Sequence, residues 1–390
     1  MDDASELQKP DLDRIVRELN AQHDANHAGS AATLVLDRWL RMLVERGGSD
    51  LLLVPGAPPS ILMDGAVRNL ESGVLDGPDI ESAVVPAMNS HALHLYREKS
   101  IADASYRIHG VGRFRINLHR ERGRAAAAVR ALPTKVPALS DLHLPPSVEA
   151  LSRLARGLVL IGGPAGSGKS TTLAALVNEI NRRDSRHIVT IEDPIEYEHS
   201  HIRSVIEQVE IGTDAPDFPT ALRAALRQAP DVIVVGEMRD PETMRIAVSA
   251  AETGHLVLST LHTMDVASTV SRISDSFPAE RQNTIRQELA MSLAAVLTQI
   301  LLPGKNGGRL PAAELLMIAY GARQHIRHNA LQHLNQEITI TKKRGSFTLE
   351  ESLAKLVAAG HIDRAEALVF AIHPEDLDIL LKSEAKASTA

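Results

Sequence analysis

Cysteine is absent from the 390 residues of this chain. Its absence excludes disulfides, a cysteine nucleophile and any zinc site built from thiolates. The chain also lacks an apolar run of the roughly 20 residues that a membrane-spanning helix needs. Its acidic start, Met1-Asp2-Asp3-Ala4, has neither the basic nor the apolar region of a signal peptide. These absences predict a cytosolic protein whose association with any membrane goes through a partner.

An excess of positive charge is missing as well. The formal net charge is −7, so the chain as a whole has no electrostatic attraction to nucleic acid or to an acidic membrane surface. A hydrophobic content of 44% and a charged content of 23% are those of a soluble globular protein. A length of 390 residues exceeds one compact core and predicts two or three domains.

The first part of the chain predicts a small α+β domain. Residues 1–30 are polar and have no apolar period, which predicts a loosely ordered tail. Residues 31–132 combine two helical segments, one of them over residues 34–43, with short alternating stretches, including residues 112–119. Residues 133–146 contain four prolines and little periodicity, which predicts an interdomain linker.

From residue 147 the pattern is that of an α/β domain. Continuous hydrophobic runs are separated by helical segments, and this predicts a mostly parallel sheet covered on both faces. The runs cover residues 158–161, 188–191, 232–235 and 256–258. We expect this α/β core to span residues 147–305, followed by a helical region over residues 306–390 that ends in a polar tail from Lys382.

A complete phosphate-binding pattern follows the first hydrophobic run. Residues 163–170 match G-x-x-x-x-G-K-[ST] between a predicted strand and a predicted helix, which is the setting that the motif requires. The backbone N–H groups of such a loop cradle phosphate oxygens, Lys169 reaches the β and γ phosphates, and the Ser170 hydroxyl binds Mg²⁺. The predicted ATP-binding residues are Gly163, Pro164, Ala165, Gly166, Ser167, Gly168, Lys169, Ser170 and Thr171.

Carboxylates follow two of the hydrophobic runs. Glu192, Asp193 and Glu196 end the second run, and Glu237 follows the third. Open parallel sheets bind ligands at the carboxyl ends of their strands, and crowded acids are stabilised by a cation between them. These acids therefore predict a site for Mg²⁺ and a positioned water. The alternatives are that Glu237 pairs with Arg239 and that Glu192 is a solvated loop acid.

Two histidines, His255 and His262, bracket the fourth hydrophobic run. At a strand end beside the γ-phosphate of ATP, such side chains could respond to the state of the nucleotide. Taken alone, each is more often a hydrogen-bonded structural histidine, so both interpretations stay open.

Arginine is concentrated from Arg107 to Arg130, where seven arginines accompany one acid. A hairpin turn at residues 122–123 would place Arg130 opposite Arg115. Like charges that face each other are destabilising, and an anion between them makes the arrangement favourable. One interpretation is a solvated basic face. A second is a nucleic-acid site, which is disfavoured because its only aromatic, Phe114, would face inward. The third is an arginine clamp on ATP, from the same subunit or a neighbour.

The motifs, in this order, resemble those of the secretion ATPase superfamily, most closely the type IV pilus retraction (PilT-like) ATPases. The resemblance runs from about residue 48 to residue 302 and continues more weakly through residues 347–353. The boxes that carry it are residues 163–170 (Walker A), 190–196 (Asp box), 232–239 (an atypical Walker B box with Glu237 in place of the usual Asp) and 254–263 (His box).

The resemblance implies a fold, an assembly and a set of roles. It implies a PAS-like N-terminal domain, a RecA-like P-loop ATPase domain and a hexamer that hydrolyses ATP with Mg²⁺. In such a site, Glu196 is the catalytic carboxylate that polarises water, and Mg²⁺ is held by Ser170 and by Glu237, partly through water. Two arginines that contact the phosphates and two histidines that couple the site to domain movement complete the set: Arg115, Arg130, His255 and His262.

The implied function is a motor that retracts type IV pili through an inner-membrane platform protein, without direct binding of nucleic acid. Extension and type II secretion ATPases usually carry an extra N-terminal domain and often a tetracysteine zinc element, so the short N-terminal tail and the absence of cysteine favour retraction. The AIRNLIRE helix motif of retraction motors is represented only by residues 321–328. Assembly, type II and type IV secretion motors therefore stay open as alternatives, with a nucleic-acid translocase as an alternative of another class.

Overall fold

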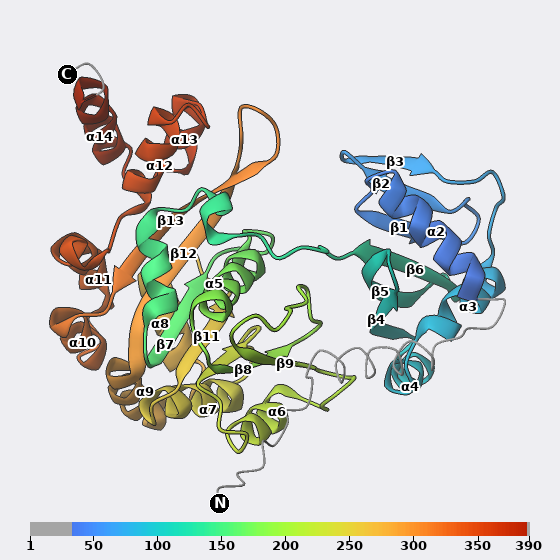
Figure 1. Cartoon of the computed structure of the whole chain (residues 1–390), viewed down its shortest axis with the longest axis horizontal. Helices are drawn as coiled ribbons and strands as arrows, with labels where there is room; N and C mark the ends of the chain where they lie inside the picture. The colour runs from blue at the N-terminus through green and yellow to red at the C-terminus, as the bar shows by residue number, and fades with distance from the viewer. Residues whose placement is uncertain (1–32, 388–390) are drawn as a thin grey trace, which may run out of the picture. The chain divides into compact units, whose positions relative to one another are not determined.

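The computed structural model describes residues 33–387, so the predicted N-terminal tail, residues 1–30, lies outside the described residues. The chain divides into two compact units, with the division between Thr134 and Lys135 (Figure 1). Most of the predicted linker belongs to the second unit, because Leu139 is buried in a core of that unit and Leu142 and Leu144 pack against the same core. The linker prediction is therefore wrong for these residues.

The first unit is the predicted α+β domain. Its six strands form one antiparallel sheet in the order β3-β2-β1-β6-β5-β4. The strands are β1 (Asp50–Leu53), β2 (Ser60–Met63), β3 (Ala66–Asn69), β4 (Ile101–Ile108), β5 (Gly112–Glu121) and β6 (Arg124–Ala131). The helices that accompany the sheet are α2 (Thr33–Glu45), α3 (Gly77–Val84) and α4 (Ser90–Lys99).

The alternation along β5 explains how this sheet forms. Phe114, Ile116 and Leu118 are fully buried and point into the core, while the residues between them are partly exposed. Arg122 and Gly123 both have positive φ angles, of 50° and 78°, as a two-residue hairpin turn requires. The register that follows places Arg115 opposite Arg130, as the sequence predicts.

The second unit is built on a seven-stranded sheet in the order β13-β12-β7-β11-β10-β8-β9. Neighbouring strands from β12 to β9 are parallel, and β13 is the antiparallel edge. The strands are β7 (Gly157–Gly162), β8 (His187–Glu192), β9 (Val205–Glu210), β10 (Val232–Val235), β11 (Leu256–Leu261), β12 (Leu293–Pro303) and β13 (Arg309–Met317). The mostly parallel α/β fold is confirmed.

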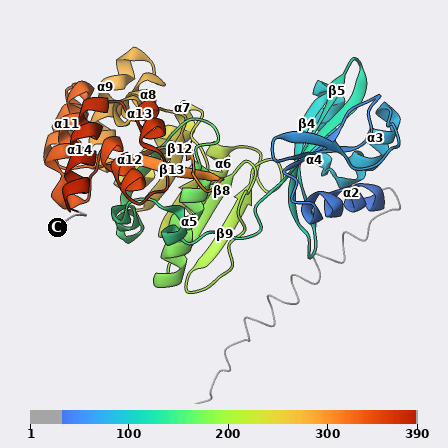
Figure 2. The same ribbon diagram turned by 90° about the horizontal axis from the view of Figure 1, so that it is seen from above.

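Helices cover both faces of this sheet (Figure 2). The helix after β7, α5 (Lys169–Arg183), lies on the face opposite to α7 (Pro241–Glu252), α8 (Val266–Asp275) and α9 (Ala279–Ser292). The remaining helices are α6 (Phe218–Ala225), α10 (Tyr320–Arg327), α11 (Leu334–Ile340), α12 (Leu349–Ala358), α13 (Arg364–Phe370) and α14 (Pro374–Ala387). No helix within residues 33–387 is long and apolar enough to cross a bilayer.

Two boundaries of the helical C-terminal region differ from the prediction. β13 lies beyond residue 305 and completes the sheet by pairing with β12, so the region from residue 306 begins with a strand. The predicted polar tail from Lys382 begins inside α14, which continues to Ala387. The strand was missed because Ala, Glu, Leu and Met, which favour helices, make up most of β13, and tertiary pairing overrides that preference.

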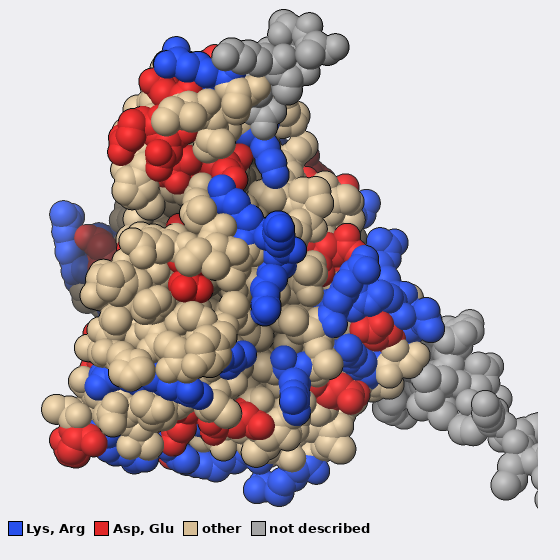
Figure 3. All heavy atoms as spheres, turned by 90° about the vertical axis from the view of Figure 1, so that its left-hand side faces the viewer, with Lys and Arg blue, Asp and Glu red and all other residues tan. Residues whose placement is uncertain are grey.

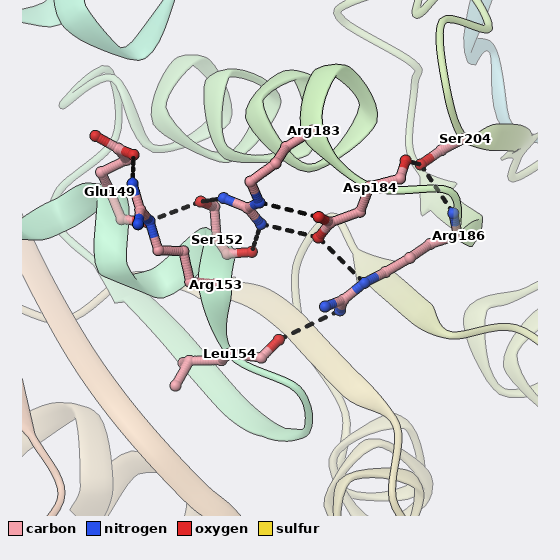
Figure 4. A network of polar contacts seen from close by, with 8 residues as sticks. All are labelled: Glu149, Ser152, Arg153, Leu154, Arg183, Asp184, Arg186 and Ser204. Atoms are coloured by element: carbon pink, nitrogen blue, oxygen red, sulfur yellow. Dashed lines mark hydrogen bonds and ion pairs between the residues drawn. The ribbon is translucent and has the colours of Figure 1, made fainter.

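A network of polar contacts fixes the chain just before β7 to the end of α5 (Figure 4). The guanidinium of Arg183 donates to the hydroxyl and the carbonyl of Ser152, at 3.0 and 2.6 Å, and to the carboxylate of Asp184. Arg186 donates to the carbonyl of Leu154 at 3.3 Å and pairs with the same carboxylate. The pKa of Asp184 is lowered, mainly by its hydrogen bonds with Arg183. The segment that enters β7 is therefore anchored to the helix that follows β7.

Candidate nucleotide site

The loop between β7 and α5 has a shape that only glycine permits at its start. Gly163 has a φ of 149°, and a Cβ atom there would lie 2.4 Å from the carbonyl oxygen of Gln299 and 2.4 Å from Ser167 Oγ. Gly166 and Gly168 also have positive φ angles. The loop therefore curls tightly into the first turn of α5, whose N–H groups have no earlier helical turn to bond to.

Lys169 lies in the centre of this loop and is 7% exposed. Its Nζ atom donates to the carbonyl oxygens of Gly163 and Pro164, at 2.8 Å each. Burial lowers the pKa of Lys169, and the carboxylate of Glu196 opposes that shift. The ammonium group is thus weakly solvated and has carbonyls as partners, which a phosphate would replace with charge-assisted hydrogen bonds.

The side chain of Ser167 also indicates that this loop would bind a phosphate. Its hydroxyl is buried and has no hydrogen-bond partner within the part of the chain that the structure describes. A buried hydroxyl without a partner is destabilising, and a phosphate oxygen in the loop would satisfy it. The loop, the lysine and this hydroxyl together fit a nucleotide phosphate.

Glu237 follows β10, and its carboxylate lies between the side chains of His262 and Arg239. His262, which follows β11, has Nε2 3.3 Å from Glu237 Oε2 and Nδ1 3.5 Å from Lys169 Nζ. Because the lysine ammonium only donates, Nδ1 accepts and the proton on Nε2 is donated to the carboxylate. Burial, followed by the charges of Lys169 and Arg239, lowers the pKa of His262, which agrees with a neutral imidazole. The other carboxylate oxygen of Glu237 pairs with Arg239, so the ion pair considered as an alternative role is present.

The segment after β8 carries two glutamates with different surroundings. Glu192 accepts hydrogen bonds from Thr190 Oγ1 at 2.7 Å and from Gln208 Nε2 at 3.2 Å, and burial raises its pKa. The interpretation of Glu192 as a solvated loop acid is therefore wrong. Glu196 is half-buried and close enough to Lys169 to act on its pKa. The structure brings Glu196, Glu237, His262 and Lys169 to one edge of the sheet.

His255 lies at the other end of β11. It precedes the strand, and its Nδ1 atom is 2.9 Å from the carbonyl oxygen of Ala250, at the amino edge where β11 begins to pair with Gly157. The six residues of β11 separate it from the phosphate loop by roughly 20 Å. The structure therefore does not bring His255 to this site, and its contacts are those of a structural histidine.

Arg115 and Arg130 belong to the first unit, and each has a carboxylate partner there. Arg115 Nε is 3.3 Å from Asp103 Oδ1, and Arg130 Nε is 2.8 Å from Asp50 Oδ1. The two arginines do face each other across the ladder, but carboxylates from the flanking strands offset their repulsion. The facing charges are therefore offset without an anion from a ligand.

Mg²⁺ is the metal that such a site implies. No group of three or more His, Asp or Glu side chains among residues 33–387 is arranged to hold a metal ion on its own. Mg²⁺ at phosphate sites takes most of its ligands from phosphate and water and few from the protein, so one hydroxyl and one carboxylate are a sufficient donor set. Ser170, at the start of α5, and Glu237 fit that requirement.

Three residues that the motifs do not include also shape the site. The side chain of Gln299 on β12 accepts from Thr172 Oγ1 at 2.9 Å and donates to the carbonyl of Ser167 at 2.7 Å, which ties the phosphate loop to the sheet. The Tyr197 hydroxyl, in the segment that carries Glu196, contacts Thr171, and Gln208 donates to the carbonyl of Tyr197. No sequence signal identifies them, because their partners are distant along the chain.

Comparison with known proteins identifies the family. The family model described as "Type II/IV secretion system protein" matches residues 146–346, which include all four boxes. The chain belongs to this family. The "Type IV pilus retractation ATPase PilT" of Pseudomonas aeruginosa is 40% identical over 337 residues, which cover 86% of this chain and 98% of that protein. The family predicted from the motifs is confirmed.

One further relative and one solved structure are similar to this chain over most of its length. The "Type IV pilus ATPase PilU" of Pseudomonas aeruginosa is 36% identical over 347 residues, which cover 89% of this chain and 91% of that protein. A crystal structure of the pilus retraction motor PilT with bound ADP aligns with a TM-score of 0.79 and 41% identity, covering 87% of this chain and 98% of the other. The structural similarity to PilT therefore agrees with the fold and the PilT-like family that the motifs predict.

Proposed function

We propose that this protein is an ATP-hydrolysing hexameric motor that powers the retraction of type IV pili from the cytoplasmic face of the inner membrane. The observation that carries this proposal is the chain of contacts from Lys169 through His262 to Glu237, on a fold that aligns with nearly the whole of PilT. These contacts would link the group that binds phosphate to the acid that supports the metal.

The residues of the site supply binding and proton transfer. Lys169 exchanges the carbonyls of its loop for the β and γ phosphates of ATP, while Thr171 and the loop N–H groups hold the remaining oxygens. Ser170 and Glu237 would hold Mg²⁺, partly through water, and a bound Mg²⁺ would supply positive charge beside the phosphates. Glu196 orients the attacking water and accepts its proton.

Contacts with the nucleotide are also proposed for Arg115 and Arg130, supplied by the same subunit or by a neighbouring one. The ion pairs that they form with Asp103 and Asp50 are solvent-exposed on the arginine side, and pairs of this kind are weak. Exchange of a carboxylate for a phosphate oxygen therefore has a small cost. His262 would respond to nucleotide binding at Lys169, because its Nδ1 atom loses that lysine as a partner when the lysine binds phosphate.

The catalytic assignment is tested with two substitutions and two measurements. We expect Lys169→Ala to abolish both nucleotide binding and hydrolysis, because the phosphate loop loses its charge. We expect Glu196→Gln to abolish hydrolysis while nucleotide binding persists, because only the proton acceptor is removed. Phosphate release and the binding of a fluorescent ADP analogue measure the two effects. Wild-type turnover by Glu196→Gln would overturn the role of Glu196.

The cellular role is tested by deletion and complementation. Loss of pilus retraction in a deletion strain, restored by the wild-type gene and not by Lys169→Ala, supports the proposal; normal retraction with a failure of protein export would favour a secretion motor. A nucleic-acid translocase would show ATPase activity stimulated by DNA. The face of the molecule in Figure 3 bears Lys and Arg in separate groups with acidic residues among them, rather than as one continuous basic stripe.

A further inference from the structure

The main chain on both sides of Glu196 is fastened by side chains of β9. Parallel pairing places Gln208 opposite Thr190 and Glu210 opposite Glu192, so the two β9 side chains lie on one face of the sheet. They are in reach of the segment that follows β8, which carries Glu196. This segment has no regular secondary structure between β8 and β9 to hold it.

Each β9 side chain bonds to a backbone group next to Glu196. Glu210, which is 3% exposed, accepts from the N–H of Ile195 at 3.0 Å. Gln208 donates to the carbonyl of Tyr197 at 2.9 Å and accepts from the N–H of His199 at 2.8 Å. Glu196 thus lies between two anchored residues, and its backbone has little freedom to move.

Tyr197 adds a connection from this segment to the phosphate helix. Its ring is 8% exposed, and its hydroxyl is 2.9 Å from Thr171 Oγ1. Thr171 is in the first turn of α5 and directly follows Ser170. Burial raises the pKa of Tyr197, so its hydroxyl stays protonated and able to donate. One hydroxyl pair therefore joins the segment that bears Glu196 to the helix that binds the phosphates.

A purely structural role for Tyr197 makes a different prediction from a positioning role. The buried ring fills space and contributes to stability, and phenylalanine would do the same. The hydroxyl adds only the link to Thr171. If the hydroxyl matters for hydrolysis beyond stability, its removal changes turnover without changing nucleotide binding.

We propose that Tyr197 is a positioning residue for ATP hydrolysis, which keeps Glu196 at a fixed distance from the phosphate helix through the hydroxyl contact with Thr171. Gln208 and Glu210 hold the main chain before and after Glu196 in the same segment. The inference rests on the proposed function of Glu196 as the proton acceptor. Proton transfer to a carboxylate depends steeply on its placement, since a displacement of about 1 Å can reduce the rate by about 100-fold.

The test is Tyr197→Phe in the full-length protein. We expect kcat to fall about tenfold, with the KM for ATP and the Kd for a fluorescent ADP analogue changed by less than about twofold. The matched control is Tyr96→Phe, which removes a hydroxyl that donates to Glu81 at 2.7 Å in the first unit; its turnover should equal that of the wild type. A wild-type kcat for Tyr197→Phe, or a loss that appears only in KM, would overturn the inference.

A second arm separates this inference from the role of Glu196. This arm compares the single variants Glu196→Gln and Tyr197→Phe in the same phosphate-release assay. If Glu196→Gln is inactive while Tyr197→Phe is as active as the wild type, the positioning role fails and the proposed function stands. If Glu196→Gln keeps wild-type turnover, the role of Glu196 fails and the positioning role fails with it.

Discussion

His199 shows how burial sets the behaviour of one residue. It lies two positions after Tyr197, is half-buried, and has its pKa lowered by desolvation from 6.5 to about 4. The folded state therefore holds a neutral imidazole where the unfolded chain would be protonated. The sign follows from proton binding: below pH 6.5 the unfolded state binds more protons, so the free energy of unfolding falls with decreasing pH until about pH 4.

The first prediction concerns this pH dependence. Between pH 7.5 and pH 5, we expect the free energy of unfolding of the second unit to fall by up to about 2 kcal/mol more in the wild type than in His199→Gln, because only the wild type gains a proton on unfolding at this position. Urea titrations at the two pH values measure the difference. His94 lies in the first unit, so His94→Gln is the control and should leave the unfolding of the second unit as in the wild type. Equal slopes for wild type and His199→Gln would contradict the prediction.

At the scale of elements, β13 contributes more than an edge to the sheet. Glu314 on this strand is 7% exposed and accepts from Thr298 Oγ1 and from the N–H of Val266, at 3.0 Å each. Val266 is the first residue of α8. The loop that precedes α8 contains His262 and Thr263. Burial raises the pKa of Glu314. An element outside the predicted core thus holds the loop that carries His262.

The second prediction tests this contribution of β13. Leu315 is fully buried, so we expect Leu315→Ala to lower the free energy of unfolding of the second unit by about 2–5 kcal/mol, from lost burial and the cavity left behind. Ile340 is 70% exposed, and Ile340→Ala should change stability by less than about 0.5 kcal/mol. Denaturant unfolding of both variants measures the effects. Similar losses for the two would show that β13 is not part of the cooperative core.

At the scale of the whole molecule, the proposed mechanism takes groups from both units. The second unit holds the phosphate loop and its acids, while the proposed arginines lie in the first. Each of these arginines has a carboxylate partner in its own unit, which offsets its charge without a nucleotide. A requirement for arginine would therefore appear in turnover and not in stability.

The third prediction follows from that division. We expect Arg115→Ala to reduce kcat by about 100-fold or more, because a guanidinium that offsets developing charge on phosphate is lost, while the thermal unfolding of the first unit changes little. Arg68→Ala, on the exposed strand β3, is the matched control. Assays of wild-type subunits mixed with Arg115→Ala subunits then report whether the arginine acts within a subunit or between subunits. Unchanged kinetics for Arg115→Ala would leave a solvated basic face as its role.

The sequence by itself determined the features that depend on neighbouring residues. The phosphate loop requires glycines and a lysine at fixed spacing, and the alternation in residues 112–119 with the turn at 122–123 defined the register of Arg115 and Arg130. Hydrophobic runs located four parallel strands because a strand buried on both faces is apolar throughout.

Only the tertiary structure decided which distant groups meet. Tyr197 contacts a hydroxyl 26 residues away, and Gln299 one 127 residues away, so no local pattern encodes either contact. Because of the direction of β11, His255 lies at the edge of the sheet opposite to the phosphate loop. Pairing with β12 makes β13 a strand, although its composition favours a helix. Local preferences amount to tenths of a kcal/mol per residue, whereas burial of a large apolar side chain in the sheet contributes roughly 1.5–3 kcal/mol, so burial decides the outcome.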